Sequence, residues 1–291
     1  MRKLFCLLFL LIAIPLAATQ LNEKSSHYNY DLSVCMIFRD EASYLKEWIE
    51  FHRLLGVEHF YLYNNLSQDN YKEVLDPYIN SGVVELIEWN KESRNVSEWD
   101  AIQVEAYNDG FSRAKNQSKW LAIIDSDEFL FPTVENNLLK FLKKYEKMKG
   151  FGGLLVNWVV FGNSWVAKIP DDKLLIETLT LCAPNGSDHY KSIFLTKRVS
   201  HVCSHHYVVY KEGYRHFTPD LGQPPLIQID RIRINHYWSR DEWYLYNFKI
   251  PRRELWGTSA DTCKYWAEAS NQASGTEILR FVQLLRERMK M

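Results

Sequence analysis

Glycine and proline are sparse in this sequence: its 291 residues include 12 Gly and 9 Pro. No Ser-, Gln- or Pro-rich run and no repeat of solenoid length interrupts the chain, so a low-complexity or repeat protein is not expected. Charge of one sign is lacking too, because 35 Lys and Arg stand against 36 Asp and Glu. Without a basic excess, general nucleic-acid binding through phosphate contacts is not expected. The chain is 46% apolar and 24% charged, and it is long enough for one large α/β unit or two small domains.

The first residues, 1–18, have the pattern of a targeting segment. Arg2 and Lys3 give a positive start, and residues 4–18 form an apolar core that ends in the small residues Ala17 and Ala18. This core of 15 residues is short for a membrane span, which needs about 20. We therefore expect a cleaved signal peptide or, as the alternative, an uncleaved signal anchor that associates the protein with a membrane. Both predict an exported body: secreted, periplasmic, or anchored and facing the secretory lumen.

Cysteine is scarce as well, with five residues, of which Cys6 belongs to the leader. An even remainder in an exported chain permits one or two disulfides. These remaining residues are Cys35, Cys182, Cys203 and Cys263. Cys35 lies in an apolar run and is expected to be a buried thiol.

The run of residues 201–206, HVCSHH, allows a second interpretation, in which it binds a metal. Alternate strand positions would align His201, Cys203 and His205 as zinc ligands. No fourth ligand with regular spacing is evident in the sequence. The alternative is an edge strand in which Cys203 pairs with Cys182 or stays free.

Short apolar runs alternate with helical periods between residues 32 and 131, which predicts a parallel βα sheet. The predicted strands are residues 32–38, 57–63, 83–87 and 120–124. The first predicted helix begins at a capping Asp40, keeps Leu45, Trp48, Ile49, His52 and Leu55 on one face, and ends at Gly56. The next helices are residues 68–79 and a helix to Ala114 that opens with a capping box of Ser97 and Asp100.

The second half of the chain is less periodic. A helix past Asn136 precedes residues 151–250, which read as mixed strands and loops, and residues 276–289 form an amphipathic helix. No linker separates the halves, so one continuous α/β domain with a mixed sheet is predicted.

An acidic turn, Asp125-Ser126-Asp127-Glu128, follows the fourth predicted strand. Ligands of open α/β sheets bind beyond such strand ends. Two adjacent carboxylates repel each other unless one keeps its proton, and a divalent cation removes that conflict. Oxygen ligands suit Mg²⁺ or Mn²⁺, which in turn bind phosphate oxygens. The alternative is a solvated turn in which Asp125 or Asp127 caps a helix.

Three stretches of sequence carry a resemblance to a known family. They are residues 39–52 (RDEASYLKEWIEFH) with Gly56 and Val57, residues 63–70 (YNNLSQDN), and residues 120–132 (WLAIIDSDEFLFP). Together they resemble the family 92 glycosyltransferases, which are related to family-2-like enzymes of the GT-A fold. Weaker similarities follow at residues 158–162, 191–193 and 235–238 and at Lys249, Arg252 and Gly257.

The resemblance implies an α/β GT-A type fold with a Rossmann-like nucleotide-binding half and a C-terminal acceptor half. By this reading a glycosyltransferase domain covers residues 31–270, with the nucleotide-binding half at 31–132 and the acceptor half at 133–270. A C-terminal helix at 274–291 follows. The implied activity is transfer of a hexose, galactose above all, from a UDP-sugar to a glycan or glycolipid acceptor, with inversion.

Site residues are implied in the same way. Asp125 and Asp127 would hold the donor and a Mn²⁺ or Mg²⁺ ion, and His236 would be a third ligand of the metal. The nucleotide pocket would be lined by Arg39, Asn64 and Asp69. Asp40 stands where the family usually has Asn after the arginine, which puts the contact to the donor base in doubt.

Two further assignments rest on the residues around His236. Lys249, Arg252 and Arg253 form a basic cluster that either contacts the diphosphate or is a solvated face. An inverting transfer needs a carboxylate as catalytic base, and Asp241 and Glu242, which soon follow His236, are the preferred candidates. The others are Asp188, Asp220, Asp230 and Glu254. His236 itself, without the resemblance, would be assigned a structural role.

Other functions remain open at this point. An exported carbohydrate-binding protein, or a transferase that has lost turnover, would keep the same fold. A Mg²⁺-dependent phosphoester hydrolase would use a similar acidic turn, but after its first strand and with a small hydroxyl residue where Phe129 stands. A glycosidase would need paired carboxylates without a metal.

Overall fold

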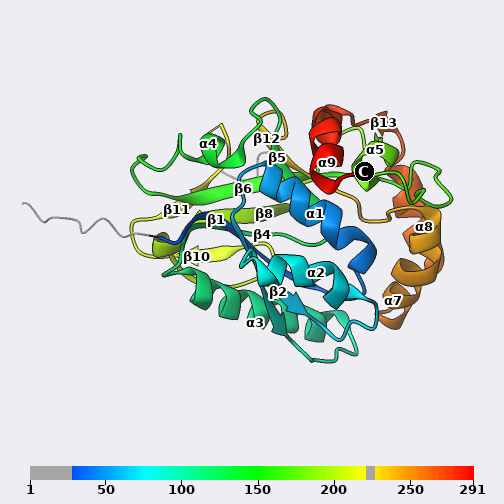
Figure 1. Ribbon diagram of the computed structural model, residues 1–291, viewed down its shortest axis with the longest axis horizontal. Helices are drawn as coiled ribbons and strands as arrows, with labels where there is room; N and C mark the ends of the chain where they lie inside the picture. The colour runs from blue at the N-terminus through cyan, green and yellow to red at the C-terminus, as the bar shows by residue number, and fades with distance from the viewer. Residues whose placement is uncertain (1–27, 221–226) are drawn as a thin grey trace, which may run out of the picture.

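A mixed sheet drawn from both halves of the chain forms the centre of the molecule (Figure 1). The computed structural model describes residues 28–220 and 227–291. Within these residues the strand order is β3-β2-β1-β4-β8-β6-β12-β5, with β11 also pairing with β6. The strands are β1 (Tyr30–Phe38), β2 (His59–Asn64), β3 (Val84–Glu88), β4 (Ser118–Ile123), β5 (Glu128–Pro132), β6 (Phe151–Val160), β8 (Tyr190–Leu195), β11 (Arg215–Phe217) and β12 (Ile232–His236).

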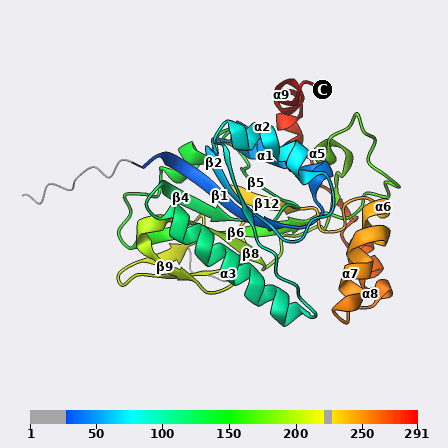
Figure 2. The same ribbon diagram turned by 60° about the horizontal axis from the view of Figure 1, so that its bottom comes forward.

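The first half of the sheet confirms the predicted parallel βα pattern. Strands β3, β2, β1 and β4 run parallel, and β1 lies between β2 and β4. Helices α1 (Ala42–Leu54) and α2 (Tyr71–Asn80) cover one face, and α3 (Val96–Ala114) covers the other (Figure 2). Alternate side chains of β1 therefore enter different cores: Val34 and Met36 pack with α1, whereas Cys35 and Ile37 pack with α3.

Both predicted helix caps are wrong. Asp40 adopts a left-handed conformation (φ 56°), and its carboxylate accepts a hydrogen bond from the backbone of Gln68 instead. At α3 the cap is Asn95, whose side chain accepts from the backbone N–H of Glu98 at 2.9 Å. At α1 the N-cap position is Glu41, which makes no capping hydrogen bond with its side chain, and the Asp69 carboxylate from another loop accepts the N–H of Ala42 at 2.7 Å.

The second half of the sheet is mixed, as predicted. β8 is antiparallel to β4 and β6, and β12 is parallel to β6 but antiparallel to β5. Two small pairs lie outside this sheet: β9 (Val199–Val202) with β10 (Val208–Tyr210), and β7 (Leu181–Cys182) with β13 (Ala273–Ser274). The helices of this half are α4 (Leu138–Leu142), α5 (Leu175–Thr178), α6 (Glu242–Tyr244), the π-helical turn η2 (Leu245–Lys249), α7 (Ile250–Leu255) and α8 (Ala260–Ala269).

The C-terminal helix is shorter than predicted. A 3₁₀ turn, η3 (Glu277–Phe281), precedes α9 (Val282–Met289), and both contribute buried side chains through Ile278 and Leu285. α9 lies against α1 (Figure 1), where the Arg288 guanidinium meets the Glu50 carboxylate at 2.5 Å.

The cysteines of the described residues are free thiols. Cys35 is buried, as predicted, and Cys182 and Cys263 are buried as well, whereas Cys203 is exposed. The predicted disulfides are therefore not formed in this part of the chain. The zinc alternative also finds no support, because residues 28–220 and 227–291 contain no group of three His, Cys, Asp or Glu side chains that could hold a metal ion.

The predicted leader, residues 1–18, lies outside the described residues. Among the residues that the structure does describe, no helix combines the length and the apolar character that a membrane span requires.

The cap of α3 gives a first test. Replacing Asn95 by Ala removes the acceptor for the Glu98 N–H, and we expect the free energy of unfolding to fall by about 1 kcal/mol. Ser97→Ala is the matched control, because Ser97 is exposed and does not cap the helix. Urea titration of both variants measures the difference. An equal loss in the two would contradict the assignment of the cap.

Candidate functional site

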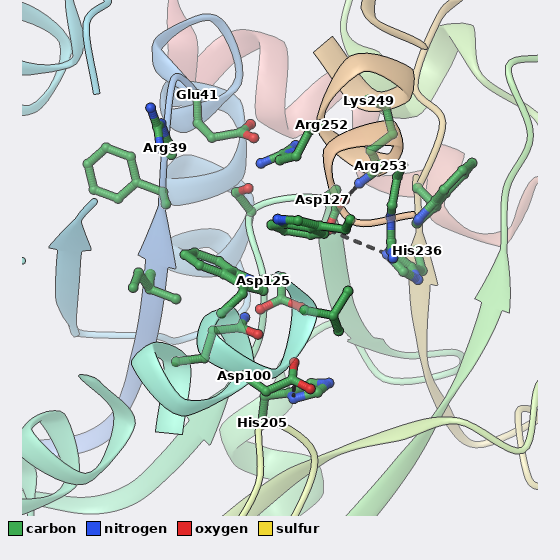
Figure 3. A pocket seen from close by; sticks show the side chains of 18 of the residues that line it. Arg39, Glu41, Asp100, Asp125, Asp127, His205, His236, Lys249, Arg252 and Arg253 are labelled. Atoms are coloured by element: carbon green, nitrogen blue, oxygen red, sulfur yellow. Dashed lines mark hydrogen bonds and ion pairs between the residues drawn. The ribbon is translucent and has the colours of Figure 1, made fainter. Parts of the chain in front are cut away.

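A pocket of about 280 Å³ opens at the carboxyl ends of β1 and β4, between α3 and the segment that carries η2 and α7 (Figure 3). Strand ends of this kind are where α/β sheets bind ligands. Its charged and titratable lining side chains are Arg39, Glu41, Asp100, Asp125, Asp127, His205, His206, His236, Lys249, Arg252 and Arg253. Trp99, Trp158, Trp238 and Trp256 supply its aromatic walls.

The acidic turn connects β4 directly to β5 and is held by its own last residue. The Glu128 carboxylate accepts the backbone N–H of Asp125 at 2.9 Å, and the Glu128 N–H donates to the Asp125 carbonyl at 3.1 Å. The Trp48 indole also donates to the Glu128 carbonyl, at 2.8 Å. The alternative of a solvated turn is therefore wrong: Asp127 is 8% exposed and Glu128 is fully buried.

Asp125 is engaged on both of its carboxylate oxygens. The Tyr107 hydroxyl donates to Oδ1 at 2.8 Å, and the Lys191 ammonium donates to Oδ2 at 2.7 Å. Lys191 comes from β8 and is 1% exposed. Burial raises the pKa of Asp125, but the charge and the hydrogen bond of Lys191, together with the nearby His205, outweigh this effect, and the pKa lies below its usual value.

Asp127 meets two other groups from the C-terminal half. Its Oδ2 accepts from Lys249 Nζ at 3.0 Å, and its Oδ1 lies 3.5 Å from Nε2 of His236 (Figure 3). Although burial disfavours the charge, Lys249 and His236 hold the pKa of Asp127 well below its usual range. Asp127 is therefore ionised throughout the physiological pH range.

Glu128 behaves in the opposite way. Burial, together with the charges of Asp125 and Asp127, raises the pKa of Glu128 well above its usual value although Lys191 acts against the rise. Asp125 and Asp127, whose pKa values are lowered, bring two negative charges into the turn at neutral pH, and two lysines, Lys191 and Lys249, face them.

The three predicted metal ligands are only partly brought together. Asp127 and His236 face each other, whereas Asp125 points to Tyr107 and Lys191. No group of three suitable side chains forms a closed metal site among the described residues. A carboxylate and an imidazole are nevertheless a ligand pair that suits Mn²⁺ better than Mg²⁺, because Mg²⁺ prefers oxygen ligands.

The basic cluster faces the pocket, so the alternative of a solvated face is wrong for it. Lys249 is 7% exposed, and Arg252 and Arg253 are partly buried. The Arg252 guanidinium donates to the Tyr244 hydroxyl at 3.3 Å, and Arg253 lies over the ring of Trp238 at 5.7 Å. Three cationic side chains thus form one wall of the pocket (Figure 3).

A buried ion pair that the sequence did not reveal closes the same end of the pocket. Arg240 is fully buried, and its Nη2 lies 2.5 Å from the Glu41 carboxylate. Its guanidinium lies 3.7 Å from the Tyr44 ring centroid and 4.4 Å from that of Tyr244. The pair joins the β1–α1 turn to the C-terminal helices. Glu41 lies within the first family-like block, but nothing in the sequence singles out Arg240.

Two predicted nucleotide ligands do not line the pocket. Asn64 donates to the Tyr71 hydroxyl at 2.9 Å and to Glu88 at 2.6 Å. Asp69 accepts the backbone N–H of Ala42 at 2.7 Å and so serves the first turn of α1. Their polar groups stabilise the loops beside the pocket, whereas Arg39 lines it as predicted.

The predicted catalytic bases are also absent from the pocket lining. Asp241 is 2% exposed, and its carboxylate accepts the N–H groups of Tyr244 and Ile169, both at 2.8 Å. Glu242 is half-buried and does not line the pocket. The geometry gives no support to either as a proton acceptor. The pocket carboxylates outside the acidic turn are Glu41 and Asp100, and Asp100 lies 3.6 Å from His205.

The Glu41–Arg240 pair generates a stability prediction. Arg240→Met leaves the Glu41 charge buried without its partner, and we expect a loss of about 3–5 kcal/mol in the free energy of unfolding. The double variant Glu41→Gln/Arg240→Met removes both charges and should recover much of that loss. Arg231→Met is the matched control, because its ion pair with Asp220 is exposed and contributes roughly 0–1 kcal/mol. Urea denaturation measures all three, and a double variant no more stable than the single one would contradict the pairing.

The chain is similar in sequence to known glycosyltransferases. Residues 30–253 match the family model described as Glycosyltransferase family 92. A family 92 protein of Ricinus communis is 27% identical over 278 residues, which are 90% of this chain and 43% of that protein. A β-1,4-galactosyltransferase of Caenorhabditis elegans is 27% identical over 118 residues, 38% of this chain and 28% of that protein. The crystal structure of S. aureus TarS residues 1–349 aligns with a TM-score of 0.39 at 10% identity, covering 88% of this chain and 73% of that one.

The chain spans less than half the length of the curated relatives it matches. Its mixed α/β sheet, with the acidic turn between β4 and β5, confirms the predicted α/β fold class. The family match covers the three resembling blocks and every pocket residue except Trp256, and it shows that the chain belongs to glycosyltransferase family 92.

Proposed function

We propose that this chain transfers a hexose from a UDP-sugar to a glycan or glycolipid acceptor, with inversion and with the help of Mn²⁺ or Mg²⁺. The observation that carries the proposal is one pocket in which Asp127 and His236 face each other beside a wall of three cations. Galactose is the proposed sugar, because the similar Caenorhabditis elegans protein is named a β-1,4-galactosyltransferase.

The basic wall supports binding of the donor diphosphate. Arg252 and Arg253 carry guanidinium groups that form paired, charge-assisted hydrogen bonds with phosphate oxygens. Lys249 adds a point charge within 3.0 Å of Asp127. A diphosphate held against these groups gains negative charge as the bond to the sugar breaks, and fixed positive charges stabilise that change.

Asp127 and His236 are the residues proposed to hold the cation. Asp127 is ionised because its pKa is low, and the Nδ1 atom of His236 is buried without a hydrogen-bond partner. Nε2, the atom that faces Asp127, is the ring nitrogen placed to act as a ligand, and it does so when the proton of the neutral ring is on Nδ1. The bound ion supplies positive charge that neutralises the departing diphosphate.

Asp125 receives a narrower role than the resemblance implied. Its oxygens are engaged by Tyr107 and Lys191, which do not line the pocket. The partners of Asp127, which are Lys249 and His236, do line it and face the space where the donor would bind. We therefore propose that Asp125 fixes the turn and shapes the donor pocket, and that it does not bind the cation directly. The wider architecture supports this reading, because the Lys191 contact ties the turn to β8.

Cation-dependent donor binding is tested by thermal unfolding. UDP with Mn²⁺ should raise the melting temperature more than either alone, because a ligand that binds only the native state stabilises it by about 2.7 kcal/mol at one hundred times its Kd. Asp127→Asn should lose the increment due to Mn²⁺ and keep a smaller response to UDP alone. Asp220→Asn is the matched control, since Asp220 is exposed and does not line the pocket. An unchanged Mn²⁺ increment in Asp127→Asn would refute the ligand assignment.

Donor choice and the role of Arg252 are tested by UDP release in the presence of acceptor. UDP-galactose should be turned over faster than UDP-glucose or UDP-N-acetylglucosamine. Arg252→Gln should raise the KM for the donor about tenfold or more, because it removes one charge-assisted contact. Arg215→Gln, an exposed arginine outside the pocket, should leave that KM unchanged. No UDP release from any of the three donors would contradict the proposed activity.

A further inference from the structure

Exposed aromatic side chains gather on the helical unit that follows β12. This unit comprises α6, η2, α7 and α8 and stands at one side of the sheet (Figure 2). Five of its aromatic side chains are between 39% and 68% exposed. We call them the aromatic face: Trp243, Tyr246, Phe248, Tyr265 and Trp266. Most exposed aromatics of a soluble protein occur singly, so a gathering of this kind marks an interaction surface.

The π-helical turn η2 builds part of this face. Residues five apart on an α-helix point about 140° away from each other. In η2 the helix is wider, and Trp243 and Phe248 come together with ring centroids 5.2 Å apart. The same turn directs Lys249 inward to Asp127 at 3.0 Å. One local irregularity therefore serves the pocket and the aromatic face together.

The aromatic face begins at the rim of the pocket. Trp266 packs edge-on against Trp238, with ring centroids 5.7 Å apart, and Trp238 lines the pocket. Beyond Trp266, the Lys264 ammonium lies 5.9 Å from the Tyr246 ring. At the far end the Lys168 ammonium lies 5.1 Å from the Trp243 ring. The surface thus continues outward from the place where the proposed transfer occurs.

The side chains of the aromatic face indicate which class of ligand it binds. Its exposed apolar side chains are aromatic, with Leu255 as the aliphatic exception on this unit. Over residues 240–269 the surface charges show no basic excess. Arg240, Asp241 and Lys249 are buried, Glu242, Arg252, Arg253 and Lys264 are half-buried, and the exposed charged side chains are Glu254, Asp261 and Glu268. An anionic lipid surface attracts a basic excess, which this unit lacks. Neutral sugar rings stack their C–H faces on aromatic rings and leave their hydroxyl groups to water.

We propose that the aromatic face binds the acceptor as a chain of neutral sugars, holding the units beyond the one that reacts. This inference rests on the proposed transferase function and deepens it, because it assigns the acceptor class and a binding path for it. Length dependence follows: an acceptor long enough to reach from Trp238 to Trp243 should bind better than a short one.

The test uses the double variant Trp243→Ser/Tyr246→Ser. The Trp243 ring contacts Lys168 and Phe248, and the Tyr246 ring contacts Lys264, so the substitutions remove contacts at the surface of the helical unit. With UDP-galactose as donor, the KM for a β-1,4-linked galactohexaose should rise about tenfold, the factor that corresponds to two lost stacking contacts. The KM for a galactobiose, the KM for the donor and kcat should not change. Tyr214→Ser is the matched control, an equally exposed aromatic outside the helical unit.

A second readout needs no turnover: retardation of the protein in native gels that contain soluble β-1,4-galactan. Retardation of the parent that the double variant loses supports the aromatic face even if UDP release fails, so the two proposals fail separately. An unchanged KM for the long acceptor together with unchanged retardation would overturn the inference. Cosedimentation of the parent with phosphatidylcholine–phosphatidylserine vesicles, lost in the double variant, would overturn it in favour of a membrane surface.

Discussion

The site depends on one constraint, which is that two ionised carboxylates are kept in a largely buried turn. Asp125 and Asp127 remain charged because Lys191 and Lys249 lie within 3.0 Å of their oxygens, and removing either lysine would leave a buried charge without its partner. Both lysines belong to the second half of the chain, whereas the turn ends the first half. The sheet pairings β4–β8 and β5–β12 bring the two halves together at this point. Fold and site are therefore coupled through the same contacts.

The first half of the fold could be predicted because its signals are local. Apolar runs and helical periods lie within single elements, so β1 to β4 and α1 to α3 follow from the sequence to within a few residues. The second half joins strands that are distant in sequence, such as β6 with β12, and no local period encodes that pairing. The helix caps also depend on tertiary contacts. The first N–H of α1 is served by Asp69 from another loop, and at α3 the cap is Asn95, a neighbour of the predicted Ser97.

The site residues could be predicted only where the sequence around them carries a local signal. Asp125, Asp127 and His236 lie in recognisable blocks, and the structure brings Asp127 and His236 together. Asn64, Asp69 and Asp241 are polar residues whose hydrogen bonds go to nearby loops and helix ends, which sequence alone does not distinguish from ligand binding. Lys191 and Arg240 become visible as site residues only through tertiary contacts.

We propose that Asp127 and His236 exchange their present contact for a shared cation when the donor binds. Crystals grown with UDP and Mn²⁺, measured at the manganese absorption edge, test it directly. The account predicts an anomalous peak bonded to the Asp127 carboxylate and to the His236 imidazole, with Lys249 moved toward the diphosphate. A structure with UDP in the pocket, no manganese at this pair, and Lys249 still paired with Asp127 would contradict it.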